Sequence, residues 1–163
     1  MKSQNPIAAP RLWIVLAKAH GSMVAYIEGR LAAQGLGLSD FMVLEVLLHK
    51  GPLTISAIGQ KVLLANASMT SAIDRLEKRG LVVRKTCDRD RRIRYVELTA
   101  AGKELTGTIY REHEKDLDFV TQELSAGERR TLYEGLKKIG FAAKEAAHGK
   151  RKAALDSSSA QSK

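Results

Sequence analysis

Apolar residues recur at steps of three or four along most of the chain, as they do on one face of an α-helix. This periodicity predicts six helices, at residues 11–33, 39–49, 55–62, 66–79, 100–124 and 126–147. Residues 81–84 form a short segment with two β-branched valines, and residues 93–98 alternate between apolar and charged side chains, which predicts two strands joined by a charged turn. The pattern therefore predicts a mostly α fold with a small β-hairpin.

Short polar side chains and glycines mark the expected helix ends. N-caps are expected at Ser39, Thr54, Asn66 or Ser68, Thr99 and Ser125. Ser125 and Glu128 have the spacing of a capping box, and Gly80 suits the position that follows a helix. From residue 149 onward there is almost nothing to bury, so residues 149–163 are expected to form a disordered basic tail.

Charge and composition narrow the class of protein. The 163 residues include 27 Lys and Arg against 18 Asp and Glu, a formal net charge of +9 that favours binding to polyanions. One cysteine excludes an intrachain disulfide and a zinc site built from several cysteines. The longest apolar run, Leu12–Ala17, is too short for a membrane span. We expect a cytoplasmic protein with no membrane partner.

The segment 54–98 carries the strongest functional pattern. Two short helices joined by a tight turn and followed by a basic hairpin form a winged helix-turn-helix, in which the second helix lies in the DNA major groove. Its outward positions and the strand after it supply the expected DNA-binding residues Asn66, Ser68, Thr70, Ser71, Arg75, Lys78 and Arg84. Taken alone, this helix favours a solvated surface carrying an Asp74–Lys78 pair.

The expected turn between the two strands is rich in arginine. Arg89, Arg91, Arg92 and Arg94 fall within six residues, and Asp90 stands between them. A slender loop of this kind suits the minor groove, whose negative potential attracts arginine. An ordinary surface turn with Asp–Arg pairs is the alternative, but together with the preceding helices the turn favours DNA binding.

The stretch from Leu38 to Leu105 resembles the MarR family of winged-helix transcriptional regulators. The matching segments are Leu38–Leu44, Gly51–Leu53, Ile58–Gly59, Ser68–Thr70, Leu76–Val82, Asp90–Arg92 and Leu98–Gly102. The resemblance implies an obligate homodimer that binds double-stranded, pseudo-palindromic operator DNA, usually as a repressor, with Arg92 in the minor groove. Together with the tail, we therefore expect four regions: an N-terminal dimerisation helix (1–37), a winged helix-turn-helix (38–100), C-terminal dimerisation helices (101–148) and residues 149–163.

The same resemblance implies a regulatory signal, since many members release DNA on binding a phenolic or other aromatic ligand, or on thiol oxidation. Polar and aromatic side chains on the first helix suggest an effector site at Trp13, His20, Met23 and Tyr26. A redox switch at Cys87, beside basic residues that favour its thiolate, is one alternative. A protein-binding adaptor that reuses the winged helix is another.

No sequence motif predicts an enzyme, a cofactor or a metal site. P-loop, G-x-S-x-G and G-x-G-x-x-G motifs are absent, and the four histidines lack zinc-motif spacing. His113 stands among carboxylates on the fifth helix, where a packed histidine is favoured over a metal ligand.

Overall fold

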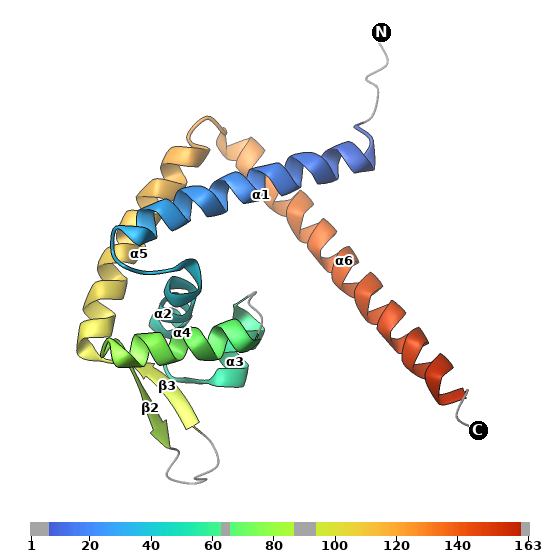
Figure 1. The fold of residues 1–163 in the computed structure, drawn as a ribbon. Helices are drawn as coiled ribbons and strands as arrows, with labels where there is room; N and C mark the ends of the chain where they lie inside the picture. Colours follow the sequence, from blue (N-terminus) through green and yellow to red (C-terminus); the bar gives the residue numbers. More distant parts are fainter. Residues whose placement is uncertain (1–6, 63–65, 87–93, 161–163) are drawn as a thin grey trace. The chain divides into compact units, whose positions relative to one another are not determined.

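The computed structural model describes residues 7–62, 66–86 and 94–160. It confirms a mostly α chain with a small sheet (Figure 1). The helices are α1 (Ala9–Ala32), α2 (Leu38–Lys50), α3 (Ile55–Lys61), α4 (Asn66–Lys78), α5 (Ala100–Thr121) and α6 (Ala126–Ala160). The strands are β1 (Leu53–Thr54), β2 (Val82–Thr86) and β3 (Arg94–Leu98).

The sheet has one strand more than the sequence predicts. Strands β2 and β3 pair antiparallel as expected, with Val82 opposite Leu98. Strand β1 joins the other edge of β3, where Leu53 lies opposite Val96, so the strand order is β1-β3-β2. Two residues are too short to show alternation, and only pairing with β3 makes them a strand.

The core lies between the three central helices and the sheet. Met69, Ile73 and Leu76, the predicted inner stripe of α4, are all buried. They belong to one cluster that also contains Leu31 from α1 and Ile109 from α5. The chain accordingly divides into compact units at Met1–Asp116 and Leu117–Lys163, so the predicted boundary between residues 100 and 101 falls inside the first unit.

Several predicted helix ends are observed. The hydroxyl oxygen of Thr54 accepts from the N–H of Ala57 at 3.2 Å, and that of Thr99 accepts from the N–H of Gly102 at 3.0 Å. Ser125 and Glu128 form the expected capping box.

The prediction of Ser39 as a cap is wrong. Helix α2 begins at Leu38, and the N–H of the capping residue Gly37 donates to Asp40 at 3.3 Å. A glycine adopts the extended cap conformation readily, and the carboxylate of Asp40 accepts from the N–H of Gly37, as the acidic residue of a capping box does.

The second unit corrects the predicted tail. Helix α6 continues to Ala160, whereas the sequence predicts disorder from residue 149. The prediction rested on the loss of apolar residues, which indicates the loss of a buried face. Lysine, arginine, alanine and leucine nevertheless have high intrinsic helix propensity, so the helix continues without that face.

Candidate nucleic-acid interface

Helix α4 presents a polar face opposite its buried stripe. Thr70, Ser71 and Lys78 are exposed, as the sequence predicts for residues that reach DNA. Asn66 and Ser68 lie in the first turn of α4, but their side chains are outside the described part. Small hydroxyl side chains near the start of this helix allow close approach to base edges.

Arg75 has partners within the chain. Its Nη2 lies 2.6 Å from Oδ1 of Asp40, a carboxylate that is only 6% exposed, and 3.3 Å from Oγ of Ser39. A buried carboxylate needs such a partner, because an isolated charge away from water is costly. Arg75 thus holds α4 against the start of α2, and its predicted contact with a phosphate stays a prediction.

Arg84 links β2 to α4 in a similar way. Its guanidinium forms ion pairs with Asp74 and Glu77, and the backbone N–H of Arg84 also donates to Glu77 at 3.2 Å. The hydrogen bond to Asp74 is the main reason that the pKa of Arg84 is raised. The side chain therefore fixes the root of the hairpin on the helix, in addition to any contact with DNA.

The described part of the hairpin carries two further basic residues. Arg94 is exposed at the start of β3, opposite Thr86, and Lys85 pairs with Glu97 across the sheet. Arg89, Asp90, Arg91 and Arg92, together with Cys87, lie outside the described residues. Their predicted roles in the minor groove and in redox sensing stay predictions.

The predicted effector residues do not form one enclosed site within the described chain. Trp13, His20 and Met23 are exposed on α1, and Trp13 is 67% exposed. Tyr26 is half-buried, and its hydroxyl donates to Asp116 on α5 at 3.2 Å. Burial, followed by the carboxylate of Asp116, raises the pKa of Tyr26.

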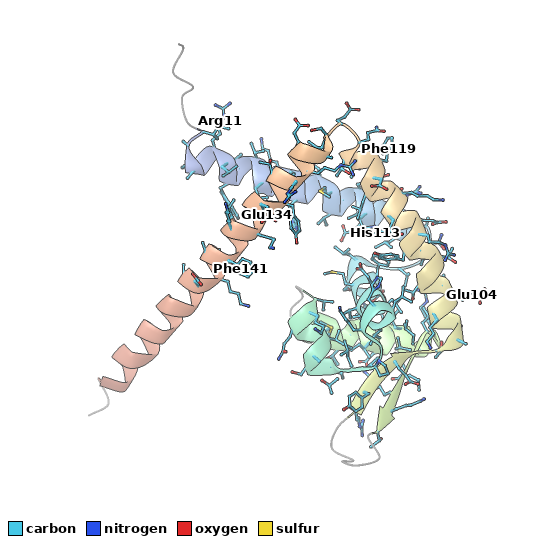
Figure 2. All side chains as sticks on the ribbon, turned by 180° about the vertical axis from the view of Figure 1, so that it is seen from behind. Arg11, Glu104, His113, Phe119, Glu134 and Phe141 are labelled. Carbon is cyan, nitrogen blue, oxygen red and sulfur yellow. The ribbon has the colours of Figure 1, made fainter. Side chains whose placement is uncertain are left out.

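A cleft between α1 and α5 lies closer to the C-terminal end of α1 than the predicted effector residues do. Arg30 closes one side of it through an ion pair with Asp116 at 2.9 Å. His113 also lines the cleft, and its position on α5 is labelled in Figure 2. Its ring packs edge-on against Phe41 at 5.0 Å, in agreement with the prediction of a packed histidine.

Sequence reasoning missed the roles of Asp40, Asp116 and Arg79. Asp40 stands in the first turn of a helix, where the helix dipole alone favours an acidic residue, so the sequence gives no sign of a further partner. Asp116 meets Arg30, which lies 86 residues earlier. Arg79 donates to main-chain carbonyls of Gln34 and Gly35, which no sequence pattern reveals.

Within the described residues, no helix is both long and apolar enough to cross a bilayer. The same part of the chain contains no group of three or more histidine, cysteine or acidic side chains suited to a metal ion.

Comparisons of the sequence with a family profile and with known proteins indicate the same family. The sequence profile of the MarR family matches residues 36–93. The HTH-type transcriptional regulator MhqR of Bacillus subtilis is 36% identical over 135 residues, which cover 83% of this chain and 93% of MhqR. FarR of Neisseria gonorrhoeae, also an HTH-type transcriptional regulator, is 26% identical over 68% of this chain and 76% of its own.

Solved structures share the fold. A mutant of MarR from E. coli complexed with operator DNA has a TM-score of 0.72 and 22% identity, covering 78% of this chain and 92% of its own. Bordetella bronchiseptica BpsR, whose DNA binding is regulated by 6-hydroxynicotinic acid, has a TM-score of 0.73 and 23% identity over 80% of this chain and 98% of its own.

Proposed function

Because the chain belongs to the MarR family of transcriptional regulators, we propose that this DNA-binding protein is a homodimeric repressor that leaves its operator when a small aromatic effector binds. Its relatives are transcriptional regulators, which confirms the prediction that it is not an enzyme.

The observation that carries the proposal is the apolar surface of the outer helices. Phe119 on α5 and Phe141 on α6, both labelled in Figure 2, are 62% and 63% exposed. Further large apolar side chains are exposed on α1 and α6, namely Leu12, Trp13, Ile14, Val15, Leu132, Tyr133, Leu136 and Ile139. Surfaces of this kind on amphipathic helices favour association with a second copy.

A dimer predicts a palindromic operator. Two-fold symmetry presents two copies of α4, and helix-turn-helix dimers bind half-sites about 34–36 Å apart, one turn of DNA. Each copy would bring its own arginine-rich wing to the minor groove. The net charge of +9 supports binding to the phosphate backbone.

Light scattering at micromolar concentration tests the dimer. Leu136→Glu places a charge in the apolar surface of α6 and should shift the protein to monomers. Thr131→Glu introduces the same single negative charge at an exposed position five residues earlier, on the side of the helix away from Leu136 and more than two turns from Phe141, and should leave the dimer intact. A wild-type protein that is folded and monomeric would contradict the proposal.

Operator binding and its release by an effector are tested by selecting duplexes from random-sequence DNA with the purified protein, with and without aromatic carboxylic acids. We expect a pseudo-palindromic consensus whose binding weakens in the presence of one acid class. Trp13 is the only tryptophan, so its fluorescence reports directly on ligands such as salicylate near α1. Selection of no sequence would contradict operator binding, and silence across a broad panel of acids would contradict the effector.

A further inference from the structure

The C-terminal ends of α1 and α4 have the same local structure. Residues 31–36 and 76–81 each read Leu, three other residues, Gly and Leu. Gly35 and Gly80 have φ of 64° and 68°, which glycine adopts without strain. In each segment the N–H of the last leucine donates to the carbonyl of the first, at 3.2 and 2.9 Å. Both helices thus end in a Schellman motif with buried leucines.

Arg79, which follows α4 directly, joins these two helix ends. Its Nη1 donates to the carbonyl of Gly35 at 2.7 Å, and its Nη2 donates to the carbonyl of Gln34 at 3.4 Å. Carbonyls at a helix C-terminus lack intrahelical donors and carry partial negative charge. One guanidinium therefore binds two carbonyls of the turn that ends α1, while its own backbone follows the end of α4.

The end of α1 is itself held in place by α5. Arg30, one turn before Gln34, pairs with Asp116 at 2.9 Å, and Tyr26 donates to the same carboxylate at 3.2 Å. Contacts therefore run without a break from Asp116 through the last turns of α1 to Arg79.

We propose that Arg79 is a positioning residue for operator binding: it fixes α4 to the end of α1 and does not itself contact DNA. Both terminal nitrogens of its guanidinium, Nη1 and Nη2, donate to main-chain carbonyls. It also lies nine residues beyond Thr70, about 13 Å along the helix from the end that approaches base edges. The inference rests on the operator binding proposed above.

The test compares wild type, Arg79→Ala and Arg79→Lys on two probes. One probe is a duplex that the wild-type protein selects from random DNA, and the other is a scrambled duplex of the same composition. Binding is measured over a range of salt concentrations. A phosphate contact contributes about one unit to the slope of log Kd against log salt, and a positioning residue contributes none.

We expect Arg79→Ala to bind the selected duplex about ten-fold more weakly and the scrambled duplex as wild type does, with an unchanged salt slope. Arg79→Lys keeps the charge but cannot donate to both carbonyls in the same planar geometry, so we expect about a three-fold loss. Thermal unfolding checks that both variants are folded. If Arg79→Ala is not folded, the comparison is made with Arg79→Lys alone.

Two results would overturn the inference. Equal loss on both duplexes with a salt slope lower by about one would identify Arg79 as a phosphate contact. Wild-type affinity of both variants for the selected duplex would show that the contact with α1 has no effect on binding. If the wild-type protein selects no sequence at all, the proposed function fails instead, which separates the two hypotheses.

Discussion

Replacing Gly102 with alanine tests how closely α5 must approach the turn after α4. A Cβ atom at this position would lie 1.9 Å from the carbonyl oxygen of Leu81 and 2.9 Å from its carbonyl carbon. Ordinary C···O contacts lie at about 3.3–3.6 Å, so the two backbones must separate by about 1.4 Å. Both atoms belong to the backbone of Leu81, so no side-chain rotation can relieve the clash.

The cost follows from three contributions. Overpacking costs about 1–3 kcal/mol. Separation also lengthens the hydrogen bond from the N–H of Thr99 to the carbonyl of Leu81, now 3.1 Å, which is worth about 1 kcal/mol. Alanine regains at most about 1 kcal/mol from its better helix propensity. We expect Gly102→Ala to lower the free energy of unfolding by about 2 kcal/mol.

Gly107 provides the matched control, because it lies in the same helix. The nearest atom to a Cβ there is Nη1 of Arg111 at 3.7 Å, an ordinary contact. Gly107→Ala should therefore raise the free energy of unfolding by about 0.5–1 kcal/mol.

Thermal unfolding at one fixed protein concentration measures both variants. For a chain of this size we expect Tm to fall by about 4–8 °C in Gly102→Ala and to rise by about 1–4 °C in Gly107→Ala. If Gly102→Ala is as stable as Gly107→Ala, helix propensity outweighs the contact and the reasoning is refuted.

Three further perturbations address other parts of the chain. The side-chain and backbone hydrogen bonds from Ser125 lower the pKa of Glu128 from 4.5. The free energy of unfolding should therefore fall as the pH drops from 4.5 through the lowered pKa. Glu128→Gln should remove this acid dependence in circular-dichroism melts. The pKa of Tyr26 is raised from 10.0 by burial and then by Asp116, so stability should decline as the pH rises from 10.0 through the raised pKa; Asp116→Asn should move that pKa back toward 10.0 in a tyrosine titration. On a fixed operator, Arg92→Ala should cost about 1–3 kcal/mol of binding, and Asp90→Ala should weaken binding as well; tighter binding by Asp90→Ala would show that the wing acts only through its charge.

The sequence by itself determined the parts of the fold that depend on near neighbours. The inner stripe of α4 and the caps at Thr54, Thr99 and Ser125 were predictable, because helix periodicity and capping involve residues three or four apart. The order of the motifs between Leu38 and Leu105 was also enough to indicate the family. Chain-local chemistry therefore specified the family and the helix that we propose faces DNA.

The tertiary structure decided which charged residues serve the fold. The sequence predicts Arg75 as a DNA-binding residue and assigns no role to Arg79. In the structure, Arg75 pairs with a buried carboxylate 35 residues away, and Arg79 donates to main-chain carbonyls 44 and 45 residues away. Strand β1 and the requirement for glycine at residue 102 likewise depend on segments far apart in the chain. Hydrophobic periodicity in the sequence indicates which face of a helix or strand is buried. The atoms that contact that face are determined only when distant segments pack together.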